Sequence, residues 1–159
     1  MSELRARVEA LEALFRHVER TRMAGVPVLN RALCVEAVGF EPVAVDAGEA
    51  PAVAGVLLTP WFMNLVWLPM QPAAGEGRVG QTRVRSLGGP TCFEFIAAHE
   101  PGFGAYEACS LASPMFDYND QAQASATAVA VLAELRPAKV VSNARRGFLF
   151  GRNAAEARP

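Results

Sequence analysis

The 159-residue sequence lacks most of the residues on which catalytic and metal-binding sites depend. It contains only two histidines and three cysteines, and the cysteines are too far apart for a zinc site or a redox pair. An odd number of separated cysteines also argues against a disulfide framework and indicates a reducing compartment. The sequence has no HExxH motif, no dinucleotide fingerprint and no phosphate-binding loop. We therefore expect no enzyme activity, no cofactor and no metal site.

An excess of charge and a long apolar run are also absent. The 15 Lys and Arg residues nearly balance the 16 Asp and Glu residues, which leaves no basic surface for a nucleic-acid partner. The longest apolar stretch, residues 52–69, is interrupted by Gly55, Thr59, Pro60 and Asn64. A transmembrane helix needs roughly 20 apolar residues, so we expect no membrane insertion. The N-terminus shows no apolar signal region, which predicts a cytoplasmic protein.

Two segments have the pattern of helices. Within residues 3–22, apolar residues recur at steps of four and three, which places them on one face of a helix. They are Leu4, Val8, Leu11, Phe15 and Val18. Ser2 is the expected N-cap of this helix. Residues 119–135 are rich in alanine and predict a second helix, capped by Asp117 or Asn119.

Short β-type runs separated by Gly and Pro lie between these helices and predict six strands. The expected strands are residues 33–40, 53–58, 64–69, 78–86, 92–99 and 106–112. Short connections favour an antiparallel meander, because parallel strands need crossovers of about a dozen residues. The predicted fold is α+β, with an N-terminal and a C-terminal helix packed on one face of the sheet. Residues 1–142 would form a single domain, and 143–159 an extended basic tail.

Cys109 is the only candidate nucleophile, with His99 as its base. Nothing in the sequence brings these two residues together, and a small buried strand residue is the simpler interpretation of Cys109. His17 lies among the polar residues of the first helix, which indicates a surface position. A Cys109-dependent thiol enzyme is therefore kept only as an alternative.

Aromatic and methionine side chains gather beside prolines in two segments, residues 59–67 and 110–116. Proline cannot donate to a sheet ladder and marks a strand start, an edge or a turn. Side chains beside it can lie at the rim of the core, as in adaptable peptide-binding surfaces. For Trp61 and Trp67 core filling is the default interpretation. The candidate binding residues are Pro60, Trp61, Phe62, Met63, Asn64, Pro114, Met115 and Phe116.

The C-terminal tail contains the pattern Arg-Arg-x-Phe-Leu, which is the core of a twin-arginine export signal. It lies at the wrong end of the chain, and no long apolar region follows it, so it should not act as one. The segment could close the fold as a last strand or strap, or dock on the protein body or on a partner. Its candidate residues are Arg145, Arg146, Phe148, Leu149 and Phe150.

Three segments of the chain resemble the HybE/HupJ-type family of [NiFe]-hydrogenase assembly chaperones. They are residues 58–64 (Leu-Thr-Pro-Trp-Phe-Met-Asn), 109–115 (Cys-Ser-Leu-Ala-Ser-Pro-Met) and 145–151 (Arg-Arg-Gly-Phe-Leu-Phe-Gly). Their order and spacing also fit the family. Some relatives carry a rubredoxin module with paired CxxC motifs, which this chain lacks, so the resemblance does not imply iron binding.

The resemblance implies a non-enzymatic accessory chaperone that holds export of a hydrogenase precursor until assembly is complete. Its clients would be the small subunit, with its twin-arginine signal, and in addition the large subunit. We expect an apolar platform of Trp61, Phe62, Met63 and Met115 to receive the signal, and nearby acidic groups to accept its arginines. The chain's own tail would compete for this site. The chain could also form a homodimer. The alternative function is that of a secretion-type chaperone for another client.

Overall fold

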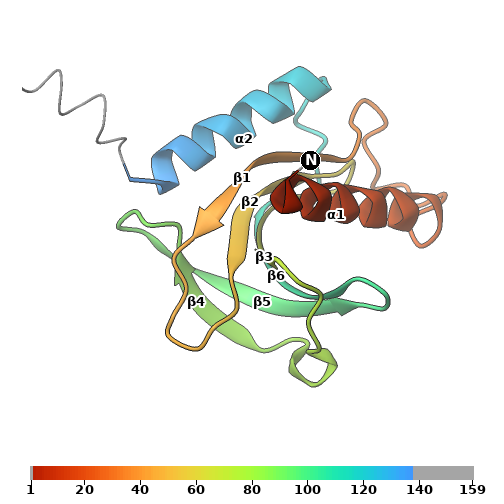
Figure 1. The fold of residues 1–159 in the computed structure, drawn as a ribbon. Coiled ribbons are helices and arrows are strands. Elements are labelled where there is room, and N and C mark those ends of the chain that lie inside the picture. The colour runs from red at the N-terminus through yellow and green to blue at the C-terminus, as the bar shows by residue number, and fades with distance from the viewer. Residues whose placement is uncertain (1, 138–159) are drawn as a thin grey trace, which may run out of the picture.

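Residues 2–137 are described by the computed structural model, and they form a six-stranded antiparallel sheet with two helices (Figure 1). In chain order the elements are α1 (Glu3–Arg20), β1 (Glu36–Val43), β2 (Ala52–Leu58), β3 (Met63–Pro69), a 3-10 turn η1 (Glu76–Arg78), β4 (Thr82–Ser86), β5 (Cys92–Glu100), β6 (Gly104–Ala112) and α2 (Gln121–Leu135). The strand order is β1-β2-β3-β6-β5-β4, so two three-stranded meanders join where β3 pairs with β6. The predicted α+β class and antiparallel sheet are confirmed.

The two helices cover opposite faces of the sheet, which corrects the expectation that both pack on one face (Figure 1). One core cluster joins α1 to Val53 and Val66, and the other joins α2 to Val56 and Leu65. Both faces accept a helix because the central strands β2 and β3 are buried on both sides. The helix residues concerned are Leu11, Phe15 and Val18 of α1 and Ala124, Ala128 and Leu132 of α2.

Both helices begin at a side-chain cap. The Ser2 hydroxyl accepts a hydrogen bond from the Arg5 N–H at 3.1 Å, as predicted. The cap of α2 is Asp120, whose carboxylate accepts from the Gln123 N–H at 2.8 Å, and not Asp117 or Asn119. Asp120 has the extended backbone that aims its carboxylate at the first turn, so the helix begins after it.

The C-terminal end of α2 is fastened against β1 and β2. A Cβ atom at Gly39, where φ is +65°, would lie 2.6 Å from Cδ1 of Leu132, so glycine is what allows this close approach. Nη2 of Arg136 donates to the carbonyls of Gly39 at 2.6 Å and Ala54 at 2.9 Å. The chain therefore leaves α2 from a fixed point beside the β1 edge of the sheet.

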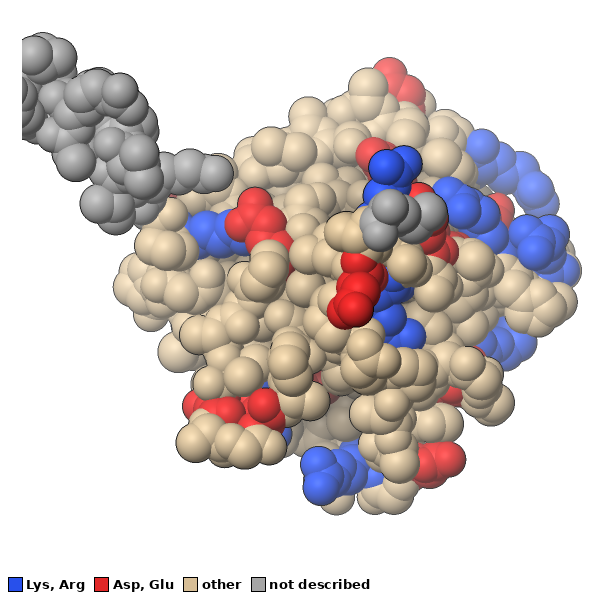
Figure 2. All heavy atoms as spheres, in the orientation of Figure 1, with Lys and Arg blue, Asp and Glu red and all other residues tan. Residues whose placement is uncertain are grey.

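The surface carries charges of both signs. Figure 2 shows acidic and basic side chains interspersed among neutral ones, with basic residues gathered toward one side of the view. Within residues 2–137, no helix is both long enough and apolar enough to cross a membrane.

Candidate functional site

The two predicted binding segments meet at one end of the sheet, because β3 and β6 are neighbours. Asn30 ties them together, since its N–H donates to the Pro60 carbonyl at 2.8 Å and its Nδ2 donates to the Met115 carbonyl at 2.9 Å. The Ser113 hydroxyl donates to the carbonyl of Trp61 at 3.2 Å. The structure thus joins residues that are far apart in the sequence into one region.

A buried threonine shapes the turn that leads into β3. The hydroxyl of Thr59, which is fully buried, accepts hydrogen bonds from the N–H groups of Trp61 at 3.2 Å and Phe62 at 2.9 Å. The turn directs both rings toward α1, where the ring centroids of Phe15 and Phe62 lie 5.7 Å apart in an edge-to-face arrangement. Trp61 and Phe62 therefore form the rim of the α1 face, and both are half-buried.

Met63 and Met115 do not share a surface with these aromatic residues, which corrects the expected four-residue platform. Met63 is 1% exposed and Met115 0% exposed, and both belong to the core on the α2 face. Phe62 and Met63 are adjacent at the start of β3, where successive side chains point to opposite faces of the sheet. A client cannot reach either methionine without opening the core.

The other candidate residues differ in their accessibility. Pro60 is buried and Pro114 exposed, while Phe116 is 55% exposed. Trp67 is 4% exposed, so the default interpretation of core filling is confirmed for this residue. Asn64 is half-buried, and its cross-strand partner is Ser110 of β6.

An apolar groove of about 260 Å³ lies on the α1 face beside the aromatic turn. We call it the α1-side groove. Its lining includes one residue of α1 and residues of β3, β5 and β6, among them Ile96, which is 52% exposed. The residues that matter for the argument are Phe15, Phe62, Asn64, Ile96, Tyr106 and Ser110. Two of the segments that carry the family resemblance, 58–64 and 109–115, thus contribute to one concave surface.

Asn64 presents an unpartnered polar atom at this groove. Its Oδ1 is buried and accepts no hydrogen bond from residues 2–137. A buried carbonyl oxygen without a donor costs about 1–3 kcal/mol. Oδ1 has almost no accessible surface of its own, so an N–H group of a bound peptide could satisfy it only after the Asn64 side chain turns toward the groove that it lines.

The groove contains no ionised side chain at neutral pH. Burial raises the pKa of Tyr106 to about 12, and the nearby Glu100 carboxylate adds to this shift. The phenol is therefore neutral, and the remaining lining is apolar or uncharged. Such a wall suits an apolar ligand and not the guanidinium groups of a signal, because it offers them no carboxylate.

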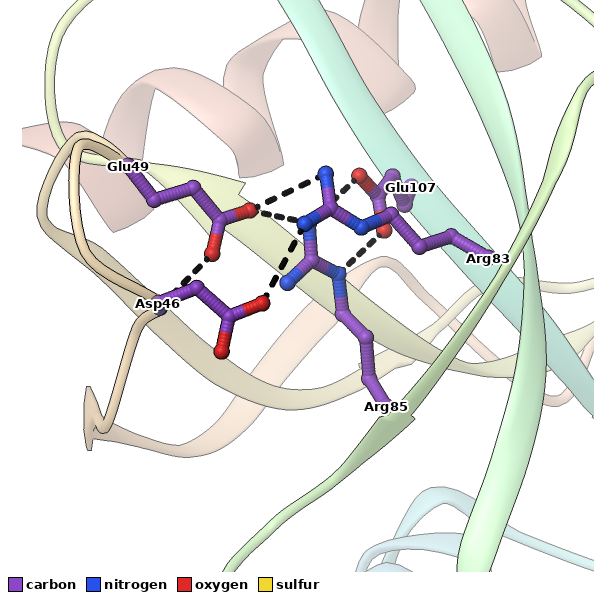
Figure 3. A network of polar contacts seen from close by, with 5 residues as sticks. All are labelled: Asp46, Glu49, Arg83, Arg85 and Glu107. Carbon is purple, nitrogen blue, oxygen red and sulfur yellow. Dashed lines mark hydrogen bonds and ion pairs between the residues drawn. The ribbon is translucent and has the colours of Figure 1, made fainter.

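Acidic residues form a cluster on the opposite face, around an arginine that the sequence analysis did not single out (Figure 3). The side chain of Arg85 is only 7% exposed, and it binds Glu107 through Nε at 2.6 Å and Glu49 through Nη2 at 2.6 Å. Its guanidinium also lies 4.0 Å above the ring of Trp67. Arg83 adds ion pairs to Glu49 at 3.2 Å and Asp46 at 3.5 Å.

The pKa values of this cluster show that it is a paired unit. Burial lowers the pKa of Arg85, but the hydrogen bonds that it donates to Glu107 and Glu49 outweigh burial and raise the pKa overall. The hydrogen bond from Arg85 likewise lowers the pKa of Glu49. The carboxylates of Asp46, Glu49 and Glu107 are thus already engaged by the chain's own arginines, away from the α1-side groove.

Arg7 is a second buried arginine that sequence reasoning missed. It is 8% exposed, donates from Nε to the Pro69 carbonyl at 2.8 Å, and lies 4.1 Å from the ring centroid of Phe103. Burial lowers its pKa. Arg7 lies three residues after Leu4 and four before Leu11, which puts it on the apolar face of α1. This spacing could have predicted its burial from the sequence.

Cys109 and His99 do not form a catalytic pair. His99 lies opposite Ala105, four residues along β6 from Cys109, which separates them by roughly 13 Å. Burial raises the pKa of the Cys109 thiol, and the charge of Glu94 adds to this, so the thiolate is disfavoured. Within the described residues, no group of three or more His, Cys, Asp or Glu side chains is placed to hold a metal ion.

The tail predictions lie outside the described residues. This applies to the domain boundary at residue 142 and to the signal-like segment with its candidate residues, namely Arg145, Arg146, Phe148, Leu149 and Phe150. Residues 136 and 137 are the last that the structure places, at the end of α2.

The sequence matches known proteins over most of its length. The family described as "[NiFe]-hydrogenase assembly, chaperone, HybE" matches residues 6–151. Protein HoxT of Cupriavidus necator is 49% identical over 94% of this chain and 91% of its own length. The hydrogenase expression/formation protein HupT of Azotobacter chroococcum is 43% identical over 88% of this chain and 91% of its own length.

A third relative, the hydrogenase expression/formation protein HupJ of Bradyrhizobium diazoefficiens, is 37% identical over 80% of this chain and 70% of its own length. No solved structure matches the chain. The family match covers the motif segments that form the α1-side groove and continues into the C-terminal tail. The chain belongs to the HybE family of [NiFe]-hydrogenase assembly chaperones.

Proposed function

We propose that this chaperone binds the precursor of a hydrogenase small subunit through the apolar part of its twin-arginine signal. Binding would hold the precursor in the cytoplasm until assembly is complete, and the large subunit would be a second client. The observation that carries the proposal is the α1-side groove, where both motif segments line one uncharged apolar surface beside an unpartnered amide oxygen.

The chemistry of the groove suits an apolar peptide segment. Phe62 and Ile96 offer apolar surface at its wall, and burial of one leucine-sized side chain contributes about 1.5–3 kcal/mol. Oδ1 of Asn64 lacks a donor among residues 2–137, so a turn of this side chain toward the groove would let it accept a hydrogen bond from a backbone N–H of the same segment. An extended stretch of a signal peptide presents an apolar side chain and a backbone N–H close together, because the side chains alternate along the backbone.

The proposal assigns the apolar part of the signal to the groove and not its arginines. The α2 face carries a cluster of three carboxylates, those of Asp46, Glu49 and Glu107. They are already paired with Arg83 and Arg85. The groove itself has no carboxylate in its lining.

The test is the affinity of the full chain for a fluorescent peptide with the sequence of a small-subunit signal, measured by fluorescence anisotropy. Ile96→Glu should weaken binding roughly 10- to 100-fold, because it replaces about 1.5–3 kcal/mol of apolar burial by a charge. Val84→Glu is the matched control, since Val84 is 66% exposed on β4 and does not line the groove. Equal affinity of Ile96→Glu and the wild type, or equal weakening by both variants, would contradict the proposal.

A second peptide separates this function from that of a chaperone for other secreted clients. In this peptide both signal arginines are replaced by lysine, and the apolar part is kept. Weaker binding of the lysine peptide would mean that groups outside the α1-side groove recognise the arginines, and would support a client with a twin-arginine signal. Equal binding of both peptides would mean that only apolar sequence is recognised, and would favour the broader class of clients.

A further inference from the structure

A second and larger groove lies on the other side of the sheet, between α2 and β1. Its volume is about 630 Å³, within the range of ordinary ligand sites, and its lining is mainly apolar. We call it the α2–β1 groove. The side chains used below are Val38, Val43, Leu87, Val129, Leu132 and Glu41. Val129 is 58% exposed although it is a large apolar residue of a helix that packs on the sheet.

We propose that the chain's own C-terminal segment docks in this groove, with Phe148, Leu149 and Phe150 as its apolar contacts. The first argument is position. Pro137 lines the groove and is the last residue that the structure places, so the segment that follows begins at the groove itself. The stretch from Pro137 to Phe148 reaches about 35 Å when extended, which is ample for a return to the groove.

The second argument is charge. Residues 1–137 contain 10 Lys and Arg against 15 Asp and Glu, whereas residues 138–159 contain five against one. The body of the protein therefore has a net charge of −5 and the tail a net charge of +4 from these side chains. Opposite charges on two parts of one chain favour their association.

The third argument is a carboxylate at the edge of the groove. Glu41 is 57% exposed at its side chain and lies 3.5 Å from Nη1 of Arg136. Arg136 is held mainly by the carbonyls of Gly39 and Ala54, so Glu41 retains oxygen lone pairs for a second cation. Arg145 and Arg146 are separated from the apolar residues of the tail only by Gly147 and would supply that cation.

This placement differs from the expectation that the tail competes with the client for one site. The α2–β1 groove lies on the face that α2 covers, and the α1-side groove lies on the opposite face. Docking of the tail is therefore independent of the proposed function, and either can fail without the other.

The test is site-specific photocross-linking in the full chain at low concentration, followed by mass spectrometry. A benzophenone amino acid at position 129 should cross-link within the same molecule to a peptide that contains residues 145–151. The same amino acid at position 79 is the matched control, because Val79 is 57% exposed and does not line the groove. The control should give no such product.

A second variant tests the contacts themselves. The double substitution Phe148→Ser with Leu149→Ser should remove most of the product from position 129, and the thermal unfolding of the body should report whether the protein remains folded. Cross-links to a second copy, equal products from positions 129 and 79, or absence of any product would each overturn the proposal. Products that persist in the double variant would overturn the assignment to Phe148 and Leu149.

Discussion

On the α1 face of the sheet, large side chains of the helix pack among aromatic rings, whereas on the α2 face the helix contributes mainly alanines. Phe15 of α1 lies within 6.5 Å of the ring centroids of Trp61, Phe62 and Tyr106. Ala124 and Ala128 of α2 are fully buried against the sheet. The large side chains of α1 border the α1-side groove, whereas the small side chains of α2 allow the helix to approach the sheet closely.

The two faces also differ in whether their buried polar atoms have partners. The α1-side groove holds an unpartnered amide oxygen and no charge, while the α2 face holds a buried arginine with two carboxylates. The buried carboxylates of this cluster already have the chain's own arginines as partners, so a client cation would have to displace Arg85 or Arg83 to bind them. An unpartnered acceptor costs stability, and a ligand can supply the missing donor. The difference favours the α1 face as the client surface.

The largest expected effect comes from breaking the cluster on the α2 face. Arg85→Ala should lower the free energy of unfolding by about 3 kcal/mol, because it leaves Glu49 and Glu107 without their buried partner. Arg83→Ala should cost less than about 1 kcal/mol, since Arg83 is half-exposed and its ion pairs are screened by solvent. Urea unfolding of the full chain measures both. Similar losses for the two variants would show that burial of Arg85 is not what stabilises this face.

A smaller effect of opposite sign is expected at the α1-side groove. Asn64→Leu should raise the free energy of unfolding by about 1 kcal/mol, because it removes a buried oxygen that lacks a donor. The same substitution should weaken binding of the signal peptide. Asn30→Leu is the control, since Asn30 binds the Met115 and Tyr118 carbonyls at 2.9 Å and its loss should destabilise the fold. Destabilisation by Asn64→Leu would mean that Oδ1 has a partner in solution.

The smallest effect is a pH dependence on the α2 face. The pKa of Glu49 is lowered in the folded state, chiefly by the hydrogen bond from Arg85. A lowered carboxyl pKa stabilises the fold above the ordinary value of 4.5, and this contribution is lost as the pH falls through the folded pKa. Glu49→Gln should therefore be less stable than the wild type at pH 7, with the difference shrinking at acid pH. A difference that stays constant with pH would refute this role of Glu49.

Much of the fold could be predicted from local patterns. The apolar periodicity of residues 3–22 and the alanine-rich segment 119–135 correspond to α1 and α2, and all six strands lie within a few residues of their expected positions. The expected strand 33–40 contains Gly39 but stops before Pro42, a residue that cannot donate to a sheet ladder and is typical of a strand end. In the structure both residues sit within an irregular edge strand, whose register shifts between Val38 and Glu41.

The site was predicted less well than the fold. The sequence pointed to the segments around residues 60 and 114, and the structure brings them together through Asn30. Side chains alternate between the two faces at the start of β3, which separates Phe62 from Met63 although the two residues are adjacent in the sequence. Ile96 and Tyr106 come from other strands and carry no local signal, so the groove they complete could not be predicted.

The sequence by itself determined where helices and strands lie, how little catalytic chemistry the chain contains, and which family it resembles. These properties depend on residues that are close together in the chain, or on motifs whose order is visible without a structure. Only the tertiary structure decided which face each helix covers, that Met63 and Met115 are core residues, and that Arg85 is paired inside the protein. The reason is that β2 and β3 are apolar on both sides, so the face that a neighbour covers is set by long-range packing.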